Sequence, residues 1–183
     1  AVDGVYDAVR ERFHSHGGYV LSGNELGAVR DVVFPGGHLS PDVVGQSAVK
    51  IAAKAGVTVP PDTKILIGEV DSVEESEPFA HEKLSPTLAT APRPAFDTPG
   101  DAAPARVAFG GVGATWGPYT DQDLHKDRVA KFGERMKTAR ILINTPSALG
   151  GIGDLYNFNL APSLTLGCGS WGGNSISDNV GPK

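Results

Sequence analysis

The amino-acid sequence predicts an α/β protein, in which helices cover a sheet of short, buried strands. Segments with apolar residues at helical spacing alternate along the chain with short, continuous apolar runs, a pattern typical of this class. The clearest apolar runs lie at residues 64–67 and 139–144. The chain has 183 residues, which is enough for one domain with a hydrophobic core.

Two helices are expected at the start of the chain. Apolar residues at helical spacing predict the first over residues 2–13, and Gly17 and Gly18 end it. Ser22 followed by Glu25 is a capping-box pattern that opens the second helix. The apolar face of this second helix consists of Leu26, Val29 and Val33.

A third helix, a buried strand and an acidic loop are expected next. The helix covers residues 47–55 and stops at Gly56, and the apolar run 64–67 predicts the strand. Residues 71–77 form the acidic loop. A metal site and a solvated run of charges are both conceivable there, and we favour the solvated run. The clustered acidic side chains of this loop are Glu74, Glu75 and Glu77.

The second half of the chain begins with a proline-rich loop at residues 92–104, because each proline inside a helix costs about 3 kcal/mol. Residues 115–119 predict a strand, and Asp121 is expected to cap a helix that runs to Met136. The run 139–144 predicts a further strand, followed by glycine-rich and largely irregular chain. The helix is expected to bury Leu124, Val129, Phe132 and Met136.

Charge and composition argue against several classes of partner. The chain carries 16 Lys and Arg against 21 Asp and Glu, a formal net charge of −5, so nothing attracts it to nucleic acid or to an anionic membrane. No apolar run approaches the roughly 20 residues that span a bilayer. The single cysteine excludes an internal disulfide, and we expect a reducing, cytoplasmic location.

Cys168 lies in a glycine-rich stretch that admits two chemical interpretations. A nucleophilic thiol needs a helix N-terminus or a nearby cation, and neither is present in this uncharged stretch, so a packed structural cysteine is favoured over a self-contained thiol enzyme. Gly167, Gly169 and Gly172 also fit a phosphate-binding glycine pattern. Because no amphipathic helix follows them, we interpret them as a tight backbone crossing.

The histidines predict no metal site. No pair has zinc-binding spacing, and one cysteine cannot build a cysteine-rich zinc site. The most site-like group is formed by His81 and Glu82, in the segment Phe79-Ala80-His81-Glu82-Lys83, although these two residues taken alone indicate a surface salt bridge. Asp154 is interpreted as a turn residue. From the residues alone, the sequence therefore predicts a soluble α/β domain and no reaction.

Several long segments resemble the aldehyde dehydrogenase half of bacterial bifunctional aldehyde–alcohol dehydrogenases. They cover residues 5–13, 63–70 and 77–86, and the longest extends from Met136 to Lys183. The resemblance covers nearly the whole chain apart from the proline-rich stretch around 90–112.

This resemblance implies a fold and a reaction. The chain would be most of the three-layer α/β catalytic domain, residues 1–183, without the nucleotide-binding domain that precedes it in the family. In the acylating branch a cysteine thiolate attacks acetaldehyde, NAD accepts the hydride, and coenzyme A takes the acyl group. Ethanol fermentation runs this reaction in reverse. Iron belongs to the alcohol dehydrogenase half, and the family's members assemble into homo-oligomers and filaments.

Two residues inherit a cofactor-binding role from the resemblance. Glu82 stands at the glutamate of the family's motif, here Glu82-Lys83-Leu84-Ser85-Pro86, whose carboxylate accepts hydrogen bonds from the hydroxyls of the nicotinamide ribose. Leu166 corresponds to an apolar residue that contacts the cofactor near the active site.

Three departures from the family limit the catalytic assignment. The family's nucleophilic cysteine lies before the segment that matches Ala1, and Cys168 matches a non-nucleophilic position. A catalytically important histidine is replaced by Ala114, which cannot transfer a proton. Pro99 and Pro104 stand where the family has a helix. We therefore expect a fragment that is inactive alone; the alternative is a degenerate, non-catalytic module kept for assembly.

Overall fold

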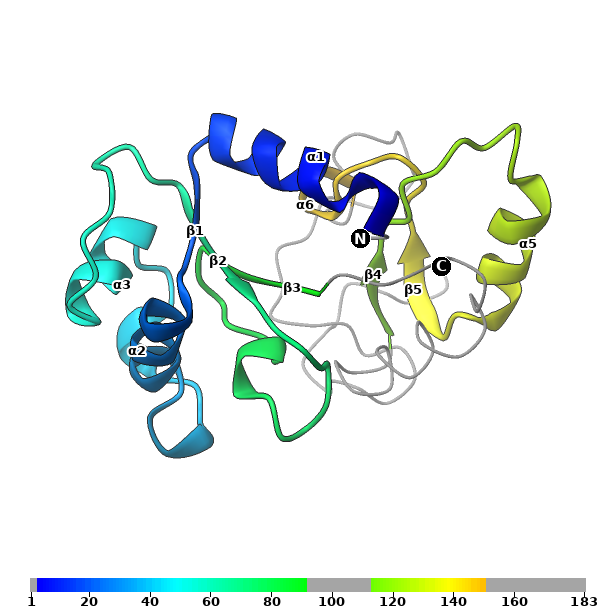
Figure 1. The fold of residues 1–183 in the computed structure, drawn as a ribbon. Helices are drawn as coiled ribbons and strands as arrows, with labels where there is room; N and C mark the ends of the chain where they lie inside the picture. The colour runs from blue at the N-terminus through cyan, green and yellow to red at the C-terminus, as the bar shows by residue number, and fades with distance from the viewer. Residues whose placement is uncertain (1–2, 92–112, 151–183) are drawn as a thin grey trace. The chain divides into compact units, whose positions relative to one another are not determined.

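The computed structural model describes residues 3–91 and 113–150 of the chain, in two units shown in Figure 1. The first unit spans Ala1–Phe96 and the second Asp97–Lys183.

A parallel sheet of three strands forms the centre of the first unit. Its order is β1 (Gly18–Val20), β2 (Ile65–Glu69) and β3 (Thr87–Thr90). Both pairs of neighbours are parallel, with Leu66 opposite Tyr19 on one side and opposite Thr87 on the other. β2 is therefore the middle strand, and its apolar side chains can be buried on both faces.

One face of this sheet is covered by α2 (Gly23–Val33) and α3 (Ala48–Lys54), as Figure 1 shows. Ser22 opens α2, where its backbone N–H donates to Glu25 Oε2 at 2.8 Å, and Ser47 caps α3. The apolar core lies under these helices. Its largest fully buried members are Val29, Val33, Val43, Ile51, Leu66 and Phe79.

The opposite face of the sheet is covered by α1 (Asp3–Ser15), so this unit has three layers. The Tyr6 hydroxyl donates to Glu69 Oε1 at 2.9 Å, and Arg10 Nε lies 3.0 Å from the same oxygen. The close approach of helix and sheet requires glycine at the start of β1, because a Cβ on Gly18 would lie 2.8 Å from the carbonyl oxygen of Phe13.

Three short 3-10 helices complete the first unit. They are η1 (Pro35–Gly37), η2 (Pro41–Val43) and η3 (Pro78–Ala80). Each begins with a proline, whose fixed φ suits the first helical position and whose missing N–H costs nothing there. η3 lies in the connection from β2 to β3.

The second unit contains a strand–helix–strand motif. β4 (Gly113–Trp116) and β5 (Thr138–Ile141) are parallel, and α5 (Lys126–Arg135) connects them. A short helix, α6 (Ser147–Gly150), follows. Asn144, at a φ of 52°, joins the loops after both strands, because its side chain accepts from Thr120 N and donates to Thr120 O at 2.8 Å each.

The α/β class and most of the predicted elements are confirmed. The three N-terminal helices, the strand at 64–67, the strands near 115 and 139 and the helix that ends at Met136 are all present within a few residues of their expected bounds. None of the described helices is long and apolar enough to cross a membrane.

Several details of the sequence prediction were wrong or incomplete. Leu124 is 74% exposed rather than buried, because Asp121 caps a separate turn before α5 and the helix begins only at Lys126. The strands β1 and β3 and the helix α6 were not predicted, because each is too short to show a periodic pattern. The predicted proline-rich loop at 92–104, the irregular chain after 150, and Asp154 lie outside the described residues.

Candidate functional site

Glu82 lies on the turn between η3 and β3, and its side chain is exposed. Its carboxylate makes no hydrogen bond or ion pair with another described residue of the chain, so its oxygens are available to a ligand. The surrounding backbone, in contrast, is held by several contacts.

The start of η3 is fixed by Glu77. Its Oε1 accepts from the backbone N–H of Phe79 at 2.8 Å, which caps the short helix. The same carboxylate receives two bonds from Arg30 on α2, from Nε at 3.0 Å and from Nη2 at 2.9 Å. This two-pronged pair ties η3 to α2. Glu77 is therefore not part of a solvated run, unlike its exposed neighbours Glu74 and Glu75.

Phe79 anchors the middle of η3 in the core. It is fully buried and packs over the middle of β2, where a Cβ added to Gly68 would lie 2.5 Å from its ring and 2.6 Å from Leu26 Cδ1. Only glycine therefore lets the phenylalanine approach the strand this closely.

Lys83 closes the turn from the other end. Its half-buried ammonium donates to the carbonyl oxygens of Phe79 at 2.8 Å and His81 at 2.7 Å, and it lies 5.2 Å from the centre of the Phe79 ring. Burial lowers the pKa of Lys83 to about 8, and the carboxylates of Glu77 and Glu82 partly oppose this shift.

The chain after Glu82 is attached to the sheet. The carbonyl of Leu84, which has a φ of 44°, accepts from Gly45 N at 3.0 Å. Leu66 N on β2 donates to Pro86 O at 2.9 Å. The backbone is therefore fixed on both sides of Glu82, while its side chain faces solvent.

His81 contributes contacts to the same turn. Its Nε2 donates to the carbonyl oxygen of Glu75 at 3.2 Å, and its ring lies 6.3 Å from the Phe34 ring. The histidine thus joins the acidic loop to the turn.

The remaining residues singled out in the sequence lie in the second unit or outside the described residues. Ala114 lies in β4, in the second unit. Leu166, Cys168, Pro99 and Pro104 lie outside the described residues. Among the described residues, no group of three or more His, Cys, Asp or Glu side chains could hold a metal ion.

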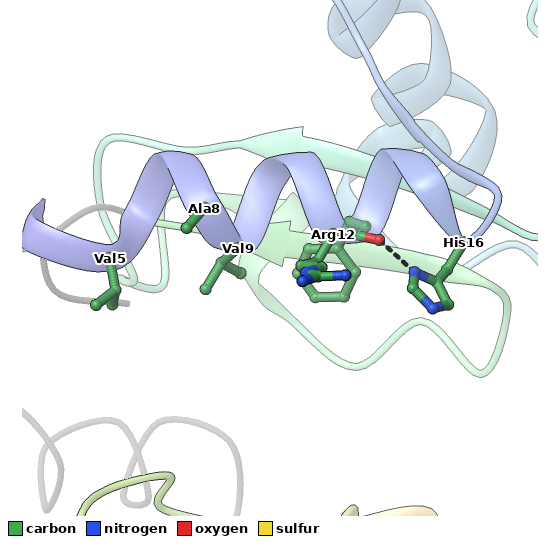
Figure 2. Close-up of a pocket in the computed structure, with 6 residues that line it drawn as sticks. Val5, Ala8, Val9, Arg12 and His16 are labelled. Atoms are coloured by element: carbon green, nitrogen blue, oxygen red, sulfur yellow. Dashed lines mark hydrogen bonds between the residues drawn. The ribbon is translucent and has the colours of Figure 1, made fainter.

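An apolar depression runs along α1. Figure 2 shows its side chains on one side of the helix, and near its end His16 Nδ1 lies 2.8 Å from the carbonyl oxygen of Arg12. Val5 is 50% exposed, so this face of the helix is not covered by the described residues. The depression is lined by Val5, Ala8, Val9, Arg12, Phe13 and His16.

The sequence alone did not indicate the contacts through which Lys83, Arg30 and Glu77 hold the Glu82 turn. Pro78 is a usable signal for a helix that starts after Glu77, because proline favours the first helical position. No local signal pairs Arg30 with Glu77, since 47 positions separate them.

Comparison with known proteins identifies relatives over the whole chain. The chain is 66% identical over 182 residues to the bifunctional aldehyde-alcohol dehydrogenase of Escherichia coli K12, covering 100% of this chain and 20% of that protein. It is 50% identical over 179 residues to the aldehyde-alcohol dehydrogenase of Clostridium acetobutylicum, covering 98% of this chain and 21% of that protein. No family model matches the chain.

A solved structure shows which part of those relatives is matched. The acetylating aldehyde dehydrogenase of Geobacillus thermoglucosidasius superposes with a TM-score of 0.83 at 32% identity, over 97% of this chain and 38% of that one. The chain thus spans about a fifth of the length of its bifunctional relatives. Because it aligns with both kinds of protein, the matched region of the bifunctional ones is their aldehyde dehydrogenase part. Over its whole length, the chain belongs to the acetylating aldehyde dehydrogenases, as a segment homologous to the aldehyde dehydrogenase part of the bifunctional aldehyde-alcohol dehydrogenases.

Proposed function

We propose that the chain acts as part of the catalytic domain of an NAD-dependent, CoA-acylating acetaldehyde dehydrogenase, within a longer bifunctional aldehyde–alcohol dehydrogenase. The reaction converts acetaldehyde, coenzyme A and NAD into acetyl-CoA and NADH, and it runs in reverse during ethanol fermentation. The observation that carries this proposal is the 66% identity to the Escherichia coli enzyme along the full chain.

Within this reaction, Glu82 binds the ribose of the nicotinamide nucleotide, which a separate domain holds. The residues present fit that role, because an exposed carboxylate without a bond to another described residue stands on a backbone fixed on both sides. Its two oxygens can accept hydrogen bonds from two neighbouring hydroxyls, and its charge strengthens both. The bound nucleotide supplies the hydride acceptor. In this proposal, the apolar side chain of Leu166 contacts the cofactor.

The reacting thiolate comes from a part of the longer polypeptide that precedes residue 1 in the family, and Cys168 is a structural cysteine. Beyond this segment, we place the parent in the cytoplasm, as a homo-oligomer or filament, with iron only in its alcohol dehydrogenase half. These last assignments rest on the family resemblance alone.

A hybrid enzyme tests the proposal. In this protein, the chain replaces the matched 182-residue region of the Escherichia coli bifunctional enzyme, which supplies every other part. We expect the hybrid to bind NAD, measured by titration calorimetry, and to form NADH slowly from acetaldehyde and coenzyme A. Ala114→His should raise the rate by about 100-fold or more, because a positioned histidine that transfers a proton contributes about that much.

The outcomes separate the two functions that the sequence permits. Ala114 is the observation that favours the alternative, a degenerate module used for assembly. A folded hybrid that polymerises but neither binds NAD nor gains activity from Ala114→His would support the module and overturn the enzyme. A hybrid that binds NAD and gains activity from Ala114→His would support the enzyme and overturn the module.

A further inference from the structure

We propose that Lys83 is the positioning residue for Glu82: its ammonium closes the turn that carries the glutamate and so sets the affinity for the nicotinamide nucleotide. This inference rests on the function proposed for Glu82 and deepens it. Lys83 itself would touch neither the nucleotide nor the aldehyde.

The geometry of the turn is the first support. Lys83 Nζ bonds to the carbonyl oxygens of Phe79 and His81, at 2.8 and 2.7 Å. In the sequence, Glu82 lies between His81 and Lys83. The His81 carbonyl oxygen accepts a hydrogen bond from the Lys83 ammonium. The two hydrogen bonds therefore make a closed ring of residues 79–83, and the direction of the Glu82 side chain follows from the shape of that ring.

The anchoring of the ring in the core is the second support. Phe79 is fully buried against β2, and its aromatic face lies 5.2 Å from the ammonium. Arg30 holds Glu77, which caps the same short helix. Since Glu82 has no bond of its own to another described residue, Lys83 is its nearest link to these fixed points.

The nature of the residue is the third support. Removing an ammonium from water is costly, and an apolar residue of similar size could fill this half-buried position without that cost. A methionine there would, however, leave the two carbonyl oxygens without their shared donor. The cost of burying the ammonium therefore offsets the stability that its two hydrogen bonds add, and what the lysine contributes is the fixed shape of an otherwise exposed turn.

The test compares matched variants in the hybrid enzyme carrying Ala114→His. Lys83→Met should raise both the Kd and the KM for NAD about tenfold, the size expected when charge-assisted hydrogen bonds that fix a ligand group are lost. It should leave kcat within about twofold, because no reacting group is altered. The urea unfolding midpoint should be unchanged. Lys50→Met removes the same charge from an exposed site on α3 and should change nothing.

Glu82→Gln and its control, Glu74→Gln in the exposed acidic loop, separate failure of the inference from failure of the proposed function. If Glu82→Gln leaves the affinity for NAD unchanged, as Glu74→Gln should, the proposed role of Glu82 is wrong. If Glu82→Gln weakens binding while Lys83→Met behaves like Lys50→Met, only the positioning role fails. A lower kcat or a lower unfolding midpoint for Lys83→Met, with unchanged KM, would also overturn it. If Lys83→Met does not fold, Lys83→Gln takes its place, because glutamine keeps a neutral hydrogen-bond donor. Lys83→Gln should raise the KM for NAD by less than tenfold, but by more than Lys50→Met does.

Discussion

Glu82 and Lys83 are neighbours in the sequence whose side chains have opposite surroundings. The glutamate is exposed and free of bonds to other described residues, whereas the lysine is half-buried and bonded to two carbonyl oxygens. A residue that binds a ligand must keep its polar atoms available, and a residue that positions it must use its polar atoms within the protein. The surroundings of the two side chains match the roles proposed for them.

The buried ammonium of Lys83 should make stability depend on pH. Its pKa is lowered from 10.5 to about 8 in the folded chain, so between these values the unfolded chain binds more protons and the unfolding free energy rises with pH. Because the residue is only half-buried, we expect a rise of about 2 kcal/mol from pH 8 to pH 10.5. Urea unfolding of the chain and of Lys83→Met across this range measures it.

In Lys83→Met, the rise in unfolding free energy that comes from Lys83 should be missing. The difference between the stability–pH curves of the two proteins therefore isolates the lysine from other titrating groups. Parallel curves for the two proteins would contradict the burial of a charged lysine. At neutral pH the two should differ by less than about 1 kcal/mol, since the cost of burying the charge offsets the lost hydrogen bonds.

At the scale of elements, the short helix η3 determines where the candidate site lies. It is too short to be stable alone, and tertiary contacts hold it in place. Arg30 on α2 fixes its cap, and Phe79 packs against Gly68 on β2. A change in any of these elements would move the turn that carries Glu82.

Alanine substitutions at two glycines test this packing. Gly68→Ala would place a methyl group 2.5 Å from the Phe79 ring, and we expect it to lower the unfolding free energy by about 2 kcal/mol. Gly27→Ala, in the interior of α2 with no atom within 4 Å of the added carbon, should raise it by up to about 1 kcal/mol. Urea unfolding of the two variants provides the measurement. Equal effects would show that Phe79 is not packed on β2 as described.

At the scale of the whole molecule, the chain has more apolar surface than its own described residues cover. The face of α1 lined by Val5 and Val9 is an example, with Val5 half exposed. The chain also spans about a fifth of the length of its bifunctional relatives. Both facts agree with the proposal that it works as a segment of a larger protein.

The purified 183-residue chain should therefore have no dehydrogenase activity of its own. The proposed reaction needs a reactive thiolate, and the sequence around the chain's one cysteine, Cys168, contains no charged residue that could activate it. The absorbance of NADH, followed with acetaldehyde, coenzyme A and NAD, measures this directly. Steady NADH formation by the chain alone would require a second source of nucleophile and would refute the fragment hypothesis.

The amino-acid sequence by itself determined the α/β class, the helix starts at Ser22 and Ser47, the middle strand β2 and the family resemblance that singles out Glu82. These depend on patterns within a few residues or on long matched segments. Only the tertiary structure decided that Arg30 meets Glu77, that Gly68 admits Phe79, and that Lys83 turns back to two carbonyls. Contacts between distant residues depend on how helices and strands pack, and no local pattern in the chain encodes that packing.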